Sequence, residues 1–206
     1  MNELRKGHVL GIAGSLRRGS YNSMLLRAAS TLSPPDMELE VYNGIAGLPL
    51  FDEDLEARAN GGPPSVTQLR DQVRAAAGLV IATPEYNQSM AGVLKNAIDW
   101  LSRPGPDEVL IKKPIAILGA SGGRWGTRLA QANLRQVLTA TESLVMPQPA
   151  IFVAEAGKVF SNEGELLNDV LRKQLEKFMQ GFSDWLTLTA AGELANDPLL
   201  LHRLVL

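Results

Sequence analysis

The stretch that decides the fold is His8-Val-Leu-Gly-Ile-Ala-Gly14-Ser15-Leu16-Arg17-Arg18-Gly19-Ser20-Tyr21-Asn22. An apolar strand runs here into a turn rich in Gly, Ser and Arg, and the turn opens a helix. Backbone N–H groups at a helix N-terminus are unpaired and carry the positive end of the helix dipole, so such a turn attracts anions. Short polar side chains add donors and the arginines add charge. The pattern therefore predicts a phosphate-binding loop after the first strand.

The composition of this loop narrows the phosphate ligand. Gly14 and Gly19 have the spacing of the first half of a P-loop, but Ser20-Tyr21 stands where Lys-Ser/Thr would hold terminal phosphates and magnesium. The glycines do not form the G-x-G-x-x-G dinucleotide fingerprint either. A monophosphate remains as the predicted ligand. The alternative is that Ser20 only caps a helix while the arginines are solvated, since Ser is a favoured N-cap residue.

Length and composition exclude several classes of function. With 206 residues, of which 45% are hydrophobic, the chain can bury one core, and we expect a single domain over residues 1–206. The net charge of −2 predicts no nucleic-acid partner. The chain has no cysteine and two histidines at opposite ends, so no metal site is expected. No apolar run approaches the ~18 residues of a membrane span, which predicts a cytoplasmic protein without membrane insertion.

Strand-like and helix-like patterns alternate along the chain. Helical spacing of apolar residues separates the apolar runs, as expected for an α/β protein with an open, doubly wound parallel sheet of about five strands. The predicted strands lie at 9–13, 39–42, 78–83, 115–120 and 150–153, and the predicted helices cover 24–32, 66–76, 94–101, 130–138 and 171–186.

Three loops that follow predicted strands carry the candidate site. The first is the Gly14–Asn22 loop, the second reads Pro84-Glu85-Tyr86-Asn87, and the third reads Gly119-Ala-Ser121-Gly-Gly123-Arg124. The carboxyl ends of parallel strands meet at one edge of the sheet, where doubly wound folds bind their ligands. A phosphate cradle, an aromatic turn and a second glycine-rich helix start would suit a flat heteroaromatic ring on a phosphate tail.

These residues resemble a known family. Gly14-Ser-Leu-Arg17 with Ser20-Tyr-Asn22, and Pro84-Glu-Tyr-Asn87 with Gly92-Val-Leu-Lys-Asn-Ala-Ile-Asp-Trp100, are similar to the signatures of the NAD(P)H-dependent FMN reductases. This flavodoxin-like group includes quinone, chromate and azo-dye reductases. The resemblance runs from about residue 8 to 139 and departs at Ala91-Gly92, where many members have Pro-Gly.

The resemblance implies a fold, a reaction and a set of site residues. The fold would have sheet order 2-1-3-4-5 with helices on both faces. FMN would take hydride from NAD(P)H and pass two electrons in a ping-pong cycle to a small-molecule acceptor such as a quinone, an azo compound, chromate or free flavin. A homodimer or homotetramer would be expected. The FMN phosphate would be held by Ser15, Arg17, Ser20, Tyr21 and Asn22, the isoalloxazine lined by Pro84, Glu85, Tyr86 and Asn87, and its pyrimidine edge faced by Ser121, Gly122, Gly123 and Arg124.

Two other functions remain open at this stage. Gly119-Ala-Ser121-Gly-Gly123 matches the G-x-S-x-G motif of serine hydrolases and is followed by acidic residues and then His202. That hypothesis leaves the first two loops without a task. A flavodoxin-like electron carrier is the second alternative, although such carriers are acidic and the first loop contains arginine.

Two further segments lie outside the three loops. The acidic run Asp52-Glu-Asp-Leu-Glu56 is expected to be a solvated loop or a helix start, and the resemblance places it near a subunit contact. The last eight residues, Leu199–Leu206, are too apolar to extend into water and are expected to pack on the body or on a second subunit.

Overall fold

A computed structural model describes residues 7–104 and 108–195 of the chain. The strands are β1 (His8–Ala13), β2 (Glu38–Tyr42), β3 (Gly78–Ala82), β4 (Pro114–Ala120), β5 (Leu144–Val145) and β6 (Ile151–Val153). The α-helices are α1 (Tyr21–Thr31), α2 (Glu53–Arg58), α3 (Pro64–Ala75), α4 (Gly92–Leu101), α5 (Arg128–Ala140) and α6 (Asp169–Ala195). Short 3₁₀ turns follow β2 at Ile45–Gly47 and β6 at Ala156–Lys158.

All described strands pair in parallel in one sheet of order β2-β1-β3-β4-β5, and β6 also pairs with β4. The flavodoxin-like order 2-1-3-4-5 is therefore confirmed. The number of strands was underestimated, because the last position of the sheet is divided between β5 and β6. Leu144-Val145 is too short to show a period in the sequence, and it pairs only with Pro114 and Ile115 at the start of β4.

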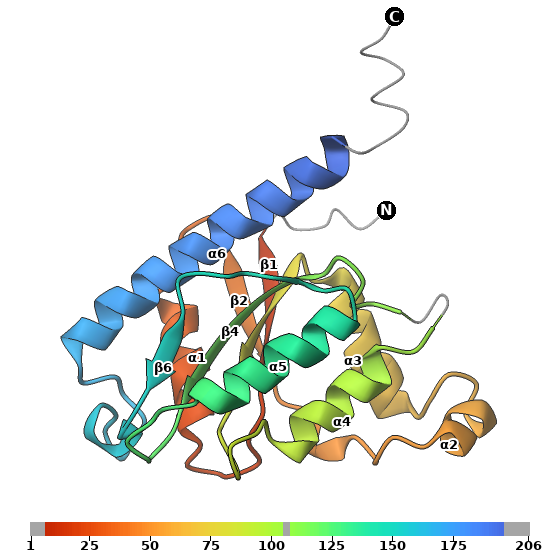
Figure 1. The fold of residues 1–206 in the computed structure, drawn as a ribbon, viewed down its shortest axis with the longest axis horizontal. Helices are drawn as coiled ribbons and strands as arrows, with labels where there is room; N and C mark the ends of the chain where they lie inside the picture. The colour runs from red at the N-terminus through yellow and green to blue at the C-terminus, as the bar shows by residue number, and fades with distance from the viewer. Residues whose placement is uncertain (1–6, 105–107, 196–206) are drawn as a thin grey trace, which may run out of the picture.

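Two layers of helices cover the sheet, as Figure 1 shows. Side chains of successive strand residues point to opposite faces, so Val9 joins the core beneath α1 and α6, while Leu10 and Ile12 join the core beneath α3, α4 and α5. Each central strand is buried on both faces, which explains its continuous apolar run. The chain reverses its direction of winding between β1 and β3, and this point lies at the carboxyl ends of the strands.

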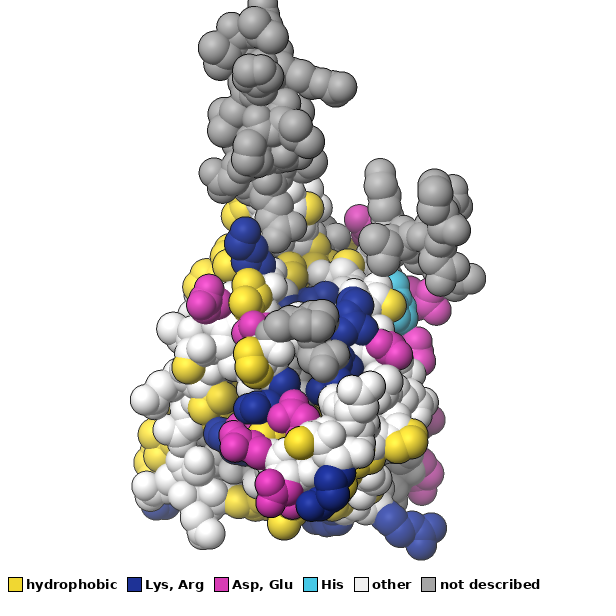
Figure 2. All heavy atoms as spheres, turned by 90° about the vertical axis from the view of Figure 1, so that its right-hand side faces the viewer, with side chains coloured by type: hydrophobic (Ala, Val, Ile, Leu, Met, Phe, Trp, Pro, Cys, Tyr) yellow, Lys and Arg dark blue, Asp and Glu magenta, His cyan; other side chains and the backbone are white. Residues whose placement is uncertain are grey.

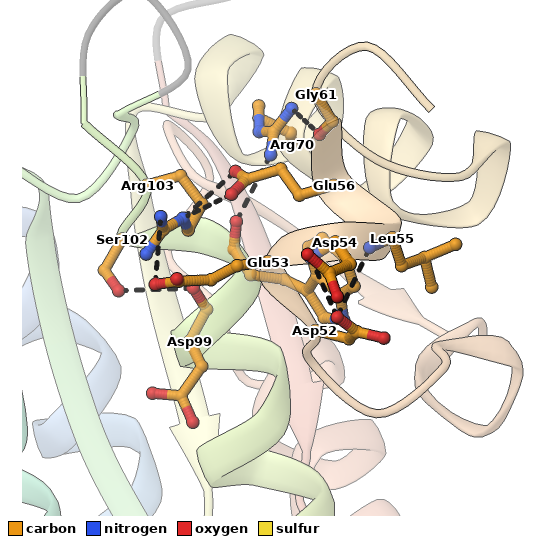
Figure 3. Close-up of polar contacts among 11 residues, drawn as sticks. Asp52, Glu53, Asp54, Leu55, Glu56, Gly61, Arg70, Asp99, Ser102 and Arg103 are labelled. Carbon is orange, nitrogen blue, oxygen red and sulfur yellow. Dashed lines mark hydrogen bonds and ion pairs between the residues drawn. The ribbon is translucent and has the colours of Figure 1, made fainter. Parts of the chain in front are cut away.

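The acidic run Asp52–Glu56 forms the start of α2, which confirms the expected helix start. The Asp52 side chain accepts the backbone N–H groups of Asp54 and Leu55 and caps this helix (Figure 3). The guanidinium of Arg103 donates to both carboxylate oxygens of Glu56, at 3.0 and 2.9 Å (Figure 3). It also lies over the ring of Phe51. These contacts attach α2 to the end of α4.

The segment before α2 is held by the side chains of α4. The amide of Asn96 donates to the carbonyl of Pro49 and accepts from the N–H of Phe51, and the indole of Trp100 donates to the same Pro49 carbonyl. These α4 side chains therefore have a structural role, because they hold the 49–51 segment in place.

The surface that carries α2 mixes charges of both signs, and Figure 2 shows Lys, Arg, Asp and Glu side chains interspersed there. No helix in the described part of the chain is long and apolar enough to cross a membrane. The expectation for Leu199–Leu206 falls outside the described residues, as does His202.

Candidate functional site

The first loop ends in a capped helix. Ser20 has extended backbone angles, and its hydroxyl accepts the N–H of Ser23 at 3.3 Å, so it is the N-cap of α1. Both readings of Ser20 are thus compatible: its hydroxyl caps the helix, and the first-turn N–H groups of Tyr21 and Asn22 stay without intrahelical partners. Gly19 has open space where a side chain would be, with no atom within 4 Å of an added Cβ. The loop therefore presents backbone donors and an open surface.

Arg17 lies across this loop. Its guanidinium donates to the carbonyl of Gly19 at 2.6 Å, and its central carbon lies 4.9 Å from the centre of the Tyr21 ring. The stacking occupies one face of the guanidinium, while most of its N–H groups remain in the exposed plane. The charge of Arg17 is thereby held at the mouth of the first loop.

Asn22 ties the first loop to the third. Its side-chain amide donates to the carbonyl of Ala120 at 2.9 Å, and its oxygen accepts the N–H of Ala120 at 2.9 Å. Both residues are buried, so this pair continues the backbone pairing of β4 through a side chain. The side-chain amide of Asn22 is directed to Ala120, so the backbone N–H is the donor that we expect Asn22 to offer a ligand.

The second loop is a tight turn. Tyr86 and Ser89 exchange two backbone hydrogen bonds of 3.0 Å, and the residues between them, Asn87 and Gln88, have φ angles of 50° and 62°. Two successive left-handed residues make a hairpin turn that normally contains glycine. Backbone strain of this kind is concentrated at functional sites. The ring of Tyr86 is 54% exposed at this turn.

Glu85 points from the second loop to the start of α5. One carboxylate oxygen accepts the N–H of Leu129 at 2.9 Å and that of Ala130 at 3.0 Å. The hydroxyl of Thr127, the residue in the N-cap position of α5, instead accepts from the side chain of Gln131. Glu85 therefore caps a helix from another loop and joins the second loop to the third.

The third loop is longer than a direct strand-to-helix turn, because α5 begins only at Arg128. Ser121 donates its N–H to the carbonyl of Val153, and its hydroxyl accepts the N–H of Gly123 at 3.1 Å. A nucleophilic serine of the G-x-S-x-G type sits on a strained turn that leads directly into a helix, and Ser121 has neither the positive φ nor the helix. His8, the one histidine among the described residues, could serve as a base only near Ser121, but it lies at the start of β1, at the end of the strand opposite to the three loops. The geometry thus disfavours the hydrolase alternative.

Gly119 has a packing reason of its own. A side chain there would overlap the carbonyl of Thr83 and the hydroxyl of Thr127. The close approach of β4 to the second loop requires glycine at this position, independently of any catalytic motif.

The sequence analysis did not predict that the turn after β6 lies near the first loop. The turn after β6 brings Gly157 against the hydroxyl of Tyr21, and Phe160 stacks on the Tyr21 ring with centroids 6.4 Å apart. Glu155 and Ala156 donate their N–H groups to the carbonyls of Gly123 and Ser121. The sequence signal was a glycine and an aromatic residue following a predicted strand, and it is too general to assign without the fold.

The rim of the three loops exposes apolar side chains and an arginine. About half or more of the surface of four residues is exposed there: Leu16, Tyr86, Trp125 and Leu129. The guanidinium of Arg124 lies over the indole of Trp125. A separate hollow of about 630 Å³ lies along the edge strand β6, between Arg128 and the first half of α6. It contains none of the predicted site residues, so the strand-end loops and not this hollow form the candidate site.

The structure gathers the predicted residues of all three loops at the carboxyl ends of the strands. Asn22 connects the first loop to the third, and Glu85 connects the second to the third. The groups with a shifted pKa lie elsewhere: burial raises the pKa of the Tyr42 hydroxyl, and partial burial lowers the pKa of Arg135. The arrangement offers backbone donors, an arginine and an open aromatic turn, and it suits binding of a planar phosphate ester better than acid–base chemistry.

Comparison with known proteins agrees with this geometry. The model of a family described as NADPH-dependent FMN reductase matches residues 8–158. An NAD(P)H-dependent FMN reductase of Pseudomonas aeruginosa is 49% identical over 177 residues, which are 86% of this chain and 94% of that protein. A quinone reductase of Escherichia coli K12 is 41% identical over 190 residues, 91% of this chain and 95% of that one. The solved structure of a flavoenzyme NAD(P)H:(acceptor) oxidoreductase from Paracoccus denitrificans has a TM-score of 0.80 at 32% identity, covering 89% of this chain and 98% of that chain.

Proposed function

The chain belongs to the NADPH-dependent FMN reductase family, and from that premise we propose that it passes two electrons from NAD(P)H through FMN to a quinone. The observation that carries the proposal is the junction of the three strand-end loops. Asn22 and Glu85 hold these loops together, while the first-turn N–H groups of α1 remain open to a phosphate.

The residues of the first loop fit the phosphate of FMN. A helix N-terminus and an arginine provide the donors and the charge that a phosphate dianion needs. Ser20 and Asn22 use their side chains within the protein, so we assign them to the phosphate through their backbone N–H groups. The proposed phosphate-binding residues are Ser15, Arg17, Ser20, Tyr21 and Asn22.

The other two loops fit the flavin ring. The hairpin turn of the second loop offers unpaired backbone groups beside an exposed aromatic ring, and we propose that Pro84, Glu85, Tyr86 and Asn87 line the isoalloxazine. Glu85 would do so while capping α5. Ser121, Gly122 and Gly123 are proposed for the pyrimidine edge. Arg124 belongs to the same loop, but its guanidinium lies over the indole of Trp125, and we propose that it binds the electron donor and not the flavin.

FMN supplies the redox chemistry when bound, because its ring accepts a hydride from NAD(P)H and returns two electrons to an acceptor. The protein needs no nucleophile for this reaction. The exposed turn at Tyr86 supports a single open face that donor and acceptor use in turn, which is a ping-pong cycle. A quinone is the proposed acceptor because one relative is named a quinone reductase. Azo compounds, chromate and free flavin are the further acceptors to assay.

Three broader features complete the proposal. One sheet joins every described strand, which supports a single domain. The exposed Leu16 and Leu129 support a homodimer or homotetramer that covers part of the rim. We propose a cytoplasmic location, where NAD(P)H is available as the donor.

Visible spectroscopy tests the proposed function directly. The protein is mixed with FMN, desalted and titrated with NADPH without oxygen, and a quinone is then added. A retained flavin band that bleaches with NADPH and returns with the quinone is the expected result. A protein that retains no flavin, or a flavin band that NADPH does not bleach, would overturn the proposal. Return of the band with chromate or an azo dye but not with the quinone would replace the acceptor.

A further inference from the structure

Arg124 and Trp125 form a cation–π pair at the surface of the third loop. The central carbon of the guanidinium lies 4.8 Å from the centre of the indole, and Trp125 is 69% exposed. Within the described residues, Arg124 makes no ion pair or hydrogen bond, whereas Arg17 donates to a carbonyl of its own loop and Arg103 pairs with Glu56. An exposed indole and an unneutralised cation are therefore presented together to solvent.

The loop that carries this pair is fixed at both ends. Gly123 accepts the N–H of Glu155 and donates its own N–H to the Ser121 hydroxyl. Gly126 is buried against Phe152, and a Cβ added at this glycine would lie 3.4 Å from the carbonyl carbon of Phe152. Arg124 and Trp125 consequently project from an anchored backbone, and a ligand that binds them does not have to order a flexible loop.

The position of the pair relates it to the proposed flavin site. Just before it, Gly122 lies next to the ring of Tyr21 in the first loop. Just after it, Leu129 is held by Glu85 of the second loop. The pair therefore stands on the rim between the two loops proposed to hold the phosphate and the ring of FMN.

We propose that Arg124 and Trp125 bind the adenosine 2′-phosphate end of NADPH, and this proposal rests on the proposed function of the same site. Stacking uses a face of the guanidinium and leaves its in-plane N–H groups free to form a paired hydrogen bond with a phosphate. An indole face is a good stacking surface for a purine base. The donor is extended, so its adenosine end can rest on the rim while its nicotinamide reaches the flavin. Arg124 would distinguish NADPH from NADH, and Trp125 would bind both.

Steady-state kinetics of the FMN-loaded enzyme test the role of Arg124. Arg124→Ala should raise the ratio of the KM for NADPH to the KM for NADH about tenfold, the effect of losing a charged hydrogen bond. Arg124→Lys keeps the charge but loses the planar fork, and it should restore part of the ratio. Arg74→Ala, which removes a guanidinium from the exposed face of α3, is the matched control. An unchanged ratio in Arg124→Ala would overturn the proposal, as would a loss of FMN binding in place of a change in KM.

Binding of a nucleotide fragment separates this proposal from the proposed function, because it needs neither flavin nor turnover. Adenosine 2′,5′-bisphosphate should quench the fluorescence of the exposed Trp125 and bind about tenfold more tightly than ADP. The Trp125 variants lack this fluorophore and are measured by isothermal titration calorimetry: Trp125→Leu should weaken the binding of both fragments, and Trp125→Phe should retain most of it. Equal affinity for the two fragments would overturn the role of Arg124 even in an active enzyme. Selective binding to a protein that NADPH cannot reduce would instead count against the proposed function alone.

Discussion

The carboxylate of Glu85 accepts the backbone N–H of Leu129 at 2.9 Å, although the two residues are separated by 44 positions in the chain. The same oxygen also accepts the N–H of Ala130. An acidic side chain at a helix N-terminus satisfies unpaired donors and interacts favourably with the dipole. Here that side chain comes from a different loop, so the cap of α5 is at the same time the connection between two walls of the proposed flavin site.

Removing this cap should destabilise the protein. Glu85→Ala leaves two N–H groups at the start of α5 without a protein partner, and we expect the free energy of unfolding to fall by about 1 to 2 kcal/mol. Urea denaturation of the FMN-free protein measures it. Glu163→Ala is the control, since Glu163 is exposed and uses only its backbone in a hydrogen bond. Equal stability of the two variants would show that water replaces Glu85 at no cost.

Replacing Asn22 should have a larger effect on folding. Asn22→Ala would leave both the N–H and the carbonyl of Ala120 buried and unsatisfied, at a cost of about 2 to 4 kcal/mol. Asn22→Asp retains an acceptor for the N–H but places a carboxylate against the carbonyl, so it should not rescue stability. Thermal unfolding compares the three proteins. Recovery of stability in Asn22→Asp would contradict the paired hydrogen bonds described for this side chain.

Arg17 should matter for the cofactor more than for the fold. Its guanidinium is exposed, and among the described residues it donates only to Gly19 of its own loop. Arg17→Ala should therefore weaken FMN binding by about 1.5 to 3 kcal/mol, the usual value for a hydrogen bond to a charged group. Titration of the apoprotein with FMN and with riboflavin, which lacks the phosphate, gives the measurement. A similar loss for both ligands would remove Arg17 from the phosphate site.

Tyr42 should make the protein less stable at alkaline pH. Burial at the end of β2 raises the pKa of its hydroxyl above the ordinary value of 10.0. The folded state then holds this proton to a higher pH than the unfolded state does. The resulting stabilisation is complete below pH 10 and disappears as the pH rises through the folded-state pKa. Tyr42→Phe should reduce the slope of unfolding free energy against pH above 10, and an unchanged slope would argue against a protonated, buried Tyr42.

Much of the architecture follows from local patterns. The runs that became β1, β3 and β4 are apolar at every position because both faces of a central parallel strand are buried. The helices between them repeat their apolar residues with the helical period. β5 escaped prediction because two residues carry no period, and its pairing with the start of β4 depends on the position of the whole sheet.

The sequence by itself determined the alternation of strands and helices, the polar loop before α1 and the three loops at the strand ends, because each depends on residues that are neighbours in the chain. Only the tertiary structure decided how the polar side chains of these loops are used. Asn22 meets Ala120 across 98 positions, and Glu85 meets the start of α5 across 44. A buried backbone group takes whichever polar side chain the fold brings to it, since leaving it unpaired is costly. Arg124 is exposed and has no hydrogen bond or ion pair within residues 7–104 and 108–195, so its guanidinium remains available to a ligand.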